Sequence, residues 1–529
     1  MKTYVFIDID DIHYNNRVGQ INPDLYEQYY NVLNYTNKTK AKILFLRFSS
    51  MYNKENYEIP LIFKTINKFA EDVSGIKNLK YINIHVNYRN LLFVLLLSKA
   101  VKKINKNIIM ILSGKYLRSM YENIITNIEW IDYIDLLLEK DSCLKNYNAI
   151  ENKEENDVIS LISRNKTDLK NNICCNLKSI KLKTEDEIKY EAKVLNNALI
   201  LKNSANIKIG EGCVFNCNYC TFRNLYFNKY VQLEPSHIIN TMNLYNEIYG
   251  TTTFLLEHEL FIKNQNKLLK FCEELIKLNG KFKWICSTRV EYLNKKNISL
   301  LAKAGCKSIF IGIETGSEKI QKYMNKNINL EKLLSTIEEI SKSGINVIFS
   351  FIYKYPEETE KDLLETFKLM YDIKEIEFRN KKSIFFYELS KIKFFPKTQI
   401  TKNYYSRLKF DNYRNSEISE YPSDIVKFID DNKEILTDFF NLRKNIKKEY
   451  EKFEDFFIYL FNNYIYINYD QVKEILFKYN FNILKIYNII FSDYRSKLYE
   501  LLNLESKNKI ENNNIKYSIC NYLFKELLQ

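Results

Sequence analysis

Glycine and proline are scarce in this chain of 529 residues, with 11 and 6 copies, and tryptophan and histidine occur only two and four times. The scarcity of glycine and proline excludes a fibrous protein and a chain dominated by flexible linkers. No apolar run approaches the roughly 20 residues that span a bilayer, and the longest, Leu91–Leu97, is followed by Ser-Lys. Asp8, Asp10 and Asp11 interrupt the apolar start, so we expect no signal peptide. These absences predict a soluble cytoplasmic protein with no membrane partner.

Apolar residues make up 46% of the chain, which is enough for sizeable cores and excludes wholesale disorder. The net charge of +14 would suit an acidic or polyanionic partner, but the basic residues are spread along the chain without a long Lys/Arg block. Ten cysteines in 529 residues do not make a disulfide scaffold. We therefore expect several cytosolic domains and do not expect nucleic acid as a partner.

The sequence pattern predicts four regions. Residues 1–140 alternate helical stretches, such as Asn90–Asn105, with strand-like runs at Tyr4–Ile9, Ile43–Phe48, Tyr81–His85 and Ile108–Leu112. This alternation predicts a Rossmann-like parallel α/β domain. Residues 141–205 are polar and predict a linker. Residues 391–529 predict a mainly helical region, with helices over Asp430–Phe461 and Val472–Leu502.

Residues 206–390 repeat a strand and a helix. The candidate strands are Asn206–Gly210, Thr252–Leu256, Phe282–Ser287, Ser308–Ile313, Asn346–Ile352 and Ser383–Leu389. Six parallel βα units predict a partial (β/α)6 barrel whose chemistry lies at the C-terminal ends of the strands. The predicted fold class is therefore α/β, with this barrel between the Rossmann-like domain and the helical region.

Three cysteines, Cys213, Cys217 and Cys220, follow the first of these strands with the spacing C-x3-C-x2-C. Three thiolates on one short loop can ligate three irons of a [4Fe–4S] cubane and leave the fourth iron open for a small chelating molecule. A zinc site needs a fourth ligand, and the nearest histidine, His237, lies seventeen residues beyond Cys220. A disulfide is disfavoured in a reducing cytosol. The spacing therefore predicts a cluster held by these cysteines.

The triplet, with Tyr219 just before its last cysteine, resembles the signature of the radical S-adenosylmethionine (SAM) superfamily. The segments Trp284–Arg289, Ala304–Ser317 and Pro356–Thr359 are similar to the subgroup that often carries an N-terminal cobalamin-binding domain. The resemblance covers 206–390 well and 80–140 weakly. It implies a [4Fe–4S] cluster, SAM and a reductant such as flavodoxin or ferredoxin. In that superfamily, one electron from the cluster cleaves SAM to methionine and a 5′-deoxyadenosyl radical, which abstracts hydrogen from a substrate.

The resemblance also implies roles for single side chains. The expected SAM-binding or cluster-packing residues are Tyr219 and Phe222 near the adenine or cluster, Glu257 at the SAM ammonium, Arg289 at its carboxylate and Glu314 at the ribose hydroxyls. Relatives often have Gly-Gly-Glu where this chain has Leu255-Leu256-Glu257, and a Gly near Lys354. Because this chain departs from both patterns, we expect SAM binding to depend more on side chains.

Cobalamin is a possible cofactor that the sequence does not favour. The segment Asp-x-His-x-x-Gly, which supplies a lower ligand in cobalamin-binding domains, is absent. His13 is expected to be an ordinary loop histidine, and His85, at the end of or within a strand, is expected to be structural. Because the region 391–529 contains only Cys520, a second cluster is not expected there.

Three functions are open at this point. The leading prediction is a radical SAM enzyme that modifies a ribosomally made peptide, for example by epimerisation or cross-linking, with a small molecule as the other substrate class. An epimerase needs a hydrogen donor, for which Cys286 and Cys306 are candidates, although their apolar surroundings also suit core positions. The alternatives are a cobalamin-dependent radical SAM methyltransferase and a non-catalytic Fe–S protein that binds nucleic acid.

Overall fold

The structure is a computed structural model that describes residues 3–8, 42–47, 59–86, 90–114, 116–117, 133–138, 185, 188–189, 203–222, 225, 230–410, 421–442, 453–494, 496–498, 501 and 513–528. The chain divides into two compact units. The first contains Met1–Leu201, Cys220–Phe227 and Phe394–Lys444, and the second contains Lys202–Tyr219, Asn228–Lys393 and Asn445–Gln529. His13 and most of the predicted linker 141–205 lie outside the described residues. The four predicted domain boundaries stay a prediction.

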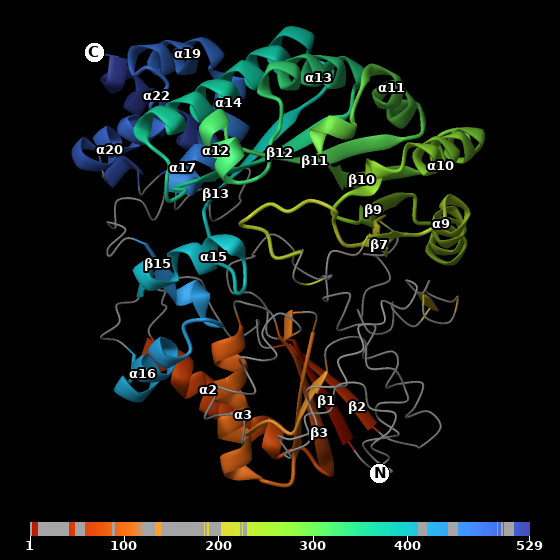
Figure 1. The fold of residues 1–529 in the computed structure, drawn as a ribbon, viewed down its shortest axis with the longest axis vertical. Helices are drawn as coiled ribbons and strands as arrows, with labels where there is room; N and C mark the ends of the chain where they lie inside the picture. The colour runs from red at the N-terminus through yellow and green to blue at the C-terminus, as the bar shows by residue number, and fades with distance from the viewer. Residues whose placement is uncertain are drawn as a thin grey trace. The chain divides into compact units, whose positions relative to one another are not determined.

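A parallel five-stranded sheet forms the first unit (Figure 1). Its order is β2 (Lys42–Arg47), β1 (Thr3–Asp8), β3 (Leu79–His85), β4 (Ile109–Ser113) and β5 (Leu136–Leu138). Helices α2 (Ile59–Ser74) and α3 (Leu91–Ile104) connect successive strands and pack against each other. This order is the flavodoxin-like, doubly wound one, whose switch point lies between β1 and β3. The predicted Rossmann-like parallel α/β class is confirmed.

The longest apolar run of the sequence lies inside α3, where Leu91–Leu97 is entirely buried. Burial on every side explains why this helix shows no polar face over these residues. Within the described ranges, no helix has the length and hydropathy that crossing a membrane requires.

Six parallel strands form the sheet of the second unit, in the order β13-β12-β11-β10-β9-β6 (Figure 1). The strands are β6 (Ala205–Lys208), β9 (Thr253–Glu257), β10 (Lys283–Thr288), β11 (Cys306–Glu314), β12 (Asn346–Tyr353) and β13 (Phe385–Lys391). The connecting helices are α9 (Pro235–Tyr249), α10 (Gln265–Lys277), α11 (Lys295–Lys303), α12 (Glu318–Tyr323), α13 (Leu330–Ser343) and α14 (Glu360–Asn380). Sequential strands are neighbours throughout, so the predicted partial (β/α)6 barrel is confirmed.

Alternation along each strand separates the two faces of this sheet. On β10, Trp284 is fully buried and its ring lies 5.3 Å from that of Phe271 on α10. The face of the sheet that carries Trp284 therefore points toward the helices. Ile285 and Ser287, on the opposite face, are only half-buried. The same alternation on β12 buries Val347, Phe349, Phe351 and Tyr353 and leaves the intervening residues half-buried. One face is thus a packed core, and the other face is accessible.

The C-terminal helices of the second unit lie beside the edge strand β13, and the first two helical segments contact it directly. They include α17 (Phe453–Tyr459), a π-helical turn (Leu460–Tyr464), α19 (Tyr469–Lys478), α20 (Ile483–Asp493) and α22 (Asn513–Leu528). Asn462 accepts from the Tyr387 N–H at 2.8 Å and donates to the Tyr387 carbonyl at 2.9 Å. The amide of Asn462 thus replaces a missing neighbouring strand and pairs backbone groups that an edge would leave exposed.

Two predicted C-terminal helices are wrong in extent, although the region is mainly helical. The segment Asp430–Phe461 contains the end of α16 (Ser423–Asp431), the strand β15 (Phe440–Asn441) and α17. Strand β15 pairs antiparallel with β14 (Lys409–Phe410) in the first unit. The segment Val472–Leu502 is interrupted at Asn480 and Phe481, which adopt φ of 50° and 61°. Apolar periodicity continues through both breaks because the flanking elements bury the same kinds of residue.

Asparagine takes positions that glycine and serine often occupy in other proteins. Ten described non-glycine residues have positive φ, and half are asparagine: Asn78, Asn279, Asn325, Asn327 and Asn480. Asparagine tolerates this left-handed region better than other residues with a Cβ. Asparagine side chains also cap the first turns of α10, α11 and α13. Tight turns are therefore available to this chain despite its few glycines.

Candidate active site at the carboxyl ends of the barrel strands

The cysteine loop follows β6 and a short strand, β7 (Gly210–Glu211). Cys213 and Cys217 are half-buried and belong to the second unit, and Cys220 is half-buried and belongs to the first. Burial raises the pKa of the Cys213 thiol, while the backbone N–H of Phe215 bonds to its sulfur and acts in the opposite direction. In the described part of the chain, no three His, Cys, Asp or Glu side chains gather as a metal-binding group. The ligand set therefore rests on the spacing and on the chemistry of three accessible thiols, which fit a cluster.

Arg289, which follows β10, is the charged group at this loop. Its side chain is 7% exposed, and its guanidinium lies 3.8 Å from the centroid of the Phe215 ring. Its Nη1 donates to the Cys217 sulfur at 3.7 Å. Its Nε donates to Glu291 at 3.1 Å, and Nη2 donates to Glu291 and to the Lys326 carbonyl. Arg289 therefore ties the cysteine loop to the segment that follows α12.

Asn218 ties the same loop to two further segments. Its backbone N–H donates to the Met324 carbonyl at 3.0 Å, and its side-chain amide donates to the Tyr323 carbonyl at 2.5 Å. The Tyr355 hydroxyl, beyond β12, donates to the Asn218 side-chain oxygen. The Tyr323 and Tyr355 rings meet edge to face at 5.5 Å. These neutral contacts hold the loop against the end of α12 and the segment that follows β12.

Glu314 ends β11 with φ of 73°, in the left-handed region, and lies at a register shift against β12. Its carboxylate folds back over Gly312, where an added Cβ would come within 2.1 Å of Oε1. Lys326 pairs with this carboxylate at 3.0 Å, and both side chains are less than 10% exposed. The predicted ribose-binding residue thus lies at the carboxyl end of its strand with a buried counter-charge. Its role toward SAM stays a prediction.

Glu257 ends β9 and is half-buried, and its carboxylate accepts from the Asn206 amide at 3.1 Å. The next residue, His258, is 6% exposed, and its Nε2 lies 3.2 Å from the Gly212 carbonyl, immediately before Cys213. Burial lowers the pKa of His258 to about 4. The neutral ring therefore donates from Nε2 and supports the backbone that leads into the cysteine loop.

Lys354 occupies the position near which relatives place glycine, and it adopts φ of 59°. Its N–H donates to the Glu358 carboxylate at 2.6 Å, and its ammonium lies 5.7 Å from the Tyr353 ring centroid. The chain therefore keeps a glycine-like backbone at the end of β12 without a glycine. The chain therefore departs from its relatives here in the side chain and not in the backbone. The hydrogen bond to Glu358 holds the strained backbone conformation.

The structure places Cys286 and Cys306 in the core. Both are at most 2% exposed, with Cys272 of α10 also buried. Burial is the largest cause that raises the pKa of Cys306, and the nearby Cys286 adds to it. Cys286 shares the face of β10 with Trp284, which packs on α10, so it points away from the accessible face. This placement suits packing better than hydrogen donation, and the donor role is untested.

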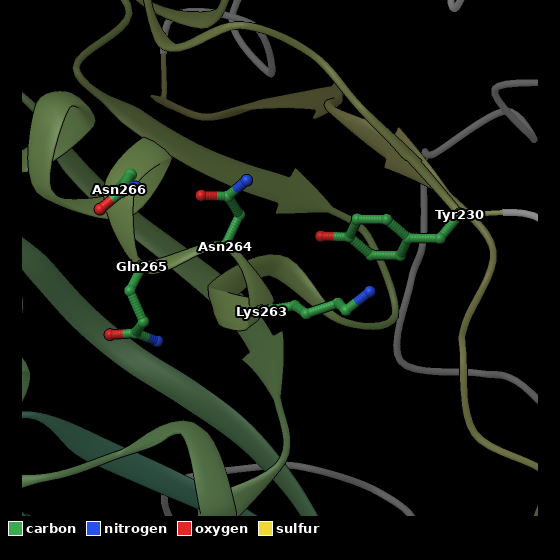
Figure 2. Close-up of a pocket in the computed structure, with 5 residues that line it drawn as sticks. All are labelled: Tyr230, Lys263, Asn264, Gln265 and Asn266. Atoms are coloured by element: carbon green, nitrogen blue, oxygen red, sulfur yellow. The ribbon is translucent and has the colours of Figure 1, made fainter.

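Tyr219 is half-buried in the second unit, and Phe222 is half-buried in the first. A separate surface recess of about 440 Å³ is lined by Tyr230, Lys263, Asn264, Gln265 and Asn266 (Figure 2). The Lys263 ammonium lies 4.7 Å from the Tyr230 ring centroid. The recess opens at the amino end of α10, and none of the predicted site residues lines it.

In the first unit, the carboxyl ends of β3 and β4 carry neutral polar groups. The Ser113 hydroxyl donates to the Asn83 side-chain oxygen at 2.6 Å, and the Asn90 amide donates to the His85 carbonyl at 3.0 Å. All four residues are buried. Gly114 follows with φ of 133°, and an added Cβ would lie 2.7 Å from the Val86 carbonyl. The carboxyl ends of the strands are where doubly wound sheets bind their ligands, so these residues are the candidates for contact with one.

Sequence reasoning missed several residues of this arrangement, among them Phe215, Asn218, His258, Glu291, Lys326 and Tyr355. The Arg289-x-Glu291 spacing hinted at a local ion pair, and His258 directly follows a predicted site residue. Nothing in the sequence linked Phe215 to Arg289, because this contact joins separate βα units, or Lys326 to Glu314, because this contact depends on how the segment after α12 folds back over the end of β11.

Comparisons with known proteins find similarity over the barrel region. Residues 207–370 match the family model described as the Radical SAM superfamily. An uncharacterized methyltransferase of Pyrococcus horikoshii is 22% identical over 162 residues, which cover 31% of this chain and 35% of the relative. An anaerobic magnesium-protoporphyrin IX monomethyl ester cyclase of Cereibacter sphaeroides is 21% identical over 289 residues, covering 52% and 46%. The chain spans about a third to a half of the length of these curated relatives.

Two solved structures share the fold over most of the chain. The cobalamin-dependent SAM radical enzyme OxsB aligns with a TM-score of 0.52 and 13% identity, covering 99% of this chain and 75% of that one. The radical SAM methyltransferase TsrM of Kitasatospora setae aligns with a TM-score of 0.50 and 11% identity, covering 76% and 75%. These findings do not support the predicted peptide substrate, and they favour the methyltransferase alternative.

Proposed function

We propose, from the premise that residues 207–370 form a radical SAM domain, that this chain is a cobalamin-dependent radical SAM methyltransferase. The domain implies a [4Fe–4S] cluster and SAM as cofactors. Bound there, the cluster would supply the electron that cleaves SAM, and cobalamin would carry a methyl group. Cys213, Cys217 and Cys220 would hold the cluster.

One observation supports this proposal most strongly. A parallel sheet in the order β2-β1-β3-β4-β5 precedes the barrel in the same chain. Such sheets bind a ligand at the carboxyl ends of strands beside the switch point. At the ends of β3 and β4, Ser113 and Gly114 are small and Asn83 is neutral, which supports a ligand with an uncharged ring system at this edge. The names of the similar proteins, methyltransferase and cobalamin-dependent enzyme, point to the same class.

The barrel residues would then bind and orient SAM. Glu257 and Glu314, at the ends of β9 and β11, offer carboxylates to the ammonium and the ribose hydroxyls. The backbone at Lys354 would approach the adenine, as glycine permits in relatives. Neutral His258 and the Asn218 contacts would keep the cysteine loop in place.

The test is loading of the anaerobically reconstituted full-length protein with hydroxocobalamin, followed by desalting and reaction with methyl-deuterated SAM and a reductant. We expect about one corrinoid per chain after desalting, and S-adenosylhomocysteine in addition to 5′-deoxyadenosine. A protein that retains no corrinoid and forms only 5′-deoxyadenosine would contradict methyl transfer while leaving radical SAM chemistry in place.

A further inference from the structure

Arg289 is a buried charged side chain that contacts the cysteine loop at Cys217 and Phe215. We propose that Arg289 is a positioning residue that raises the reduction potential of the cluster through its contact with Cys217, and that Glu291 moderates this effect. The inference rests on the radical SAM domain and its cluster, and it is independent of methyl transfer to any substrate.

The hydrogen-bonding capacity of Arg289 is largely committed within the protein. Nε and Nη2 donate to Glu291, and Nη2 also donates to the Lys326 carbonyl. Only Nη1 faces the loop, where it donates to the Cys217 sulfur at 3.7 Å. A guanidinium usually binds a carboxylate through two parallel N–H groups. Because such a pair is already used by Glu291, the geometry favours the sulfur of Cys217 over the SAM carboxylate.

The Phe215 ring packs against the Arg289 guanidinium and holds it close to the cysteine loop. The Phe215 ring lies two residues from each of Cys213 and Cys217, and the guanidinium carbon is 3.8 Å from its centroid. The Phe215 N–H bonds to the Cys213 sulfur. One residue thus contacts Arg289 through its ring and Cys213 through its backbone. A shift of the guanidinium would move the loop with it.

The sign of the effect follows from charge. Hydrogen bonds to the sulfurs and the local net charge set the potential of an Fe–S cluster, and positive charge favours the reduced form. Arg289 is 7% exposed, so water screens its charge weakly, whereas Glu291 is 33% exposed and better screened. The guanidinium should therefore have the larger effect on the potential. Removal of the Arg289 charge should lower the potential, and removal of the Glu291 charge should raise it.

The experiment is a potentiometric titration of the reconstituted full-length protein, followed by electron paramagnetic resonance of the reduced cluster, with iron content measured for each variant. For Arg289→Gln we expect about a tenfold lower ratio of reduced to oxidised cluster at a fixed potential, which is about 59 mV more negative for a one-electron couple. Glu291→Gln should shift the potential in the positive direction by less. Arg289→Lys should fall between Arg289→Gln and the unmodified protein.

A purely structural role for Arg289 would lower iron content without moving the potential of the clusters that assemble. Equal potentials in all variants, or shifts of the same sign for Arg289→Gln and Glu291→Gln, would overturn the proposal. If Arg289→Gln assembles no cluster, Glu291→Gln decides alone, because it leaves Arg289, Phe215 and the cysteines in place. These potentials can be measured on protein that holds no corrinoid, so failure here and failure of methyl transfer are distinguishable.

Discussion

The two parallel sheets of this chain carry different chemistry at the carboxyl ends of their strands. In the first unit, the ends of β3 and β4 (the neutral edge) carry Asn83, Asn90, Ser113 and Gly114, whereas β1 and β2 end in Asp8 and Arg47. In the second, the same edge holds ion pairs of which three members are buried: Arg289, Glu314 and Lys326. Buried ion pairs contribute little net stability, because desolvation offsets their attraction. Their presence at this charged edge therefore suits electrostatic work on a charged ligand.

Loss of the cluster is the largest effect we expect. It should follow from a substitution at the charged edge and should leave corrinoid binding at the neutral edge unchanged. Cys217→Ala should lower bound iron from about four per chain toward zero and abolish SAM cleavage. Iron analysis and chromatography of 5′-deoxyadenosine measure both. Cys272→Ala, a buried thiol of α10, is the matched control and should keep its cluster. Retention of corrinoid by Cys217→Ala would sharpen the separation of the two edges, and full iron in this variant would contradict the ligand assignment.

A substitution at the neutral edge should remove the corrinoid and keep the iron. Gly114→Ala places a Cβ 2.7 Å from the Val86 carbonyl at a φ of 133°. We expect a loss of about 2–4 kcal/mol in the stability of the first unit and no retained corrinoid, with iron content unchanged. Absorbance after desalting reports the corrinoid. In Gly75→Ala the nearest atom to the added Cβ is 3.5 Å away, so this control should bind the corrinoid normally. Equal corrinoid in both variants would contradict a role for Gly114 in corrinoid binding.

The pH dependence of stability tests the buried His258. Its pKa in the folded protein is about 4, against 6.5 ordinarily, so the unfolded state binds more protons between these values. Stability should therefore fall as the pH is lowered from about 6.5 to 4, by up to about 3 kcal/mol from this residue. Urea unfolding at several pH values should show a shallower slope for His258→Asn. His237→Asn, at an exposed position of α9, should keep the slope; identical slopes in all three proteins would contradict a buried neutral His258.

The smallest effect concerns the backbone strain at Lys354. Replacing it by glycine at φ of 59° should relieve the left-handed penalty and stabilise the second unit by about 0.5–1 kcal/mol. Denaturant midpoints measure this change. Lys270→Gly, at an exposed position in the middle of α10, should instead destabilise by about 1 kcal/mol. A loss of stability in Lys354→Gly would mean that the contacts of its side chain outweigh the strain.

Local pattern predicted much of the fold. The ten predicted strands agree with the observed ones to within a few residues, because alternation and short apolar runs report burial directly, whereas the three-residue β5 was missed. The C-terminal breaks were missed, since β15 and the positive φ values at Asn480 and Phe481 depend on tertiary contacts that periodicity does not contain. The same limit applies to Asn462, whose pairing with β13 joins residues far apart in sequence.

The sequence by itself determined the chemistry available: three thiols at cluster spacing, six βα units to carry them, and no apolar run long enough for a membrane. A short motif does so because its ligands are neighbours along the chain. Only the tertiary structure decided which charges meet. Arg289 reaches Cys217 and Phe215 through the packing of separate βα units, and Lys326 reaches Glu314 because the segment between α12 and α13 folds back over the end of β11. Likewise, the order β2-β1-β3-β4-β5 is a property of strand pairing, which alternation along one strand cannot reveal.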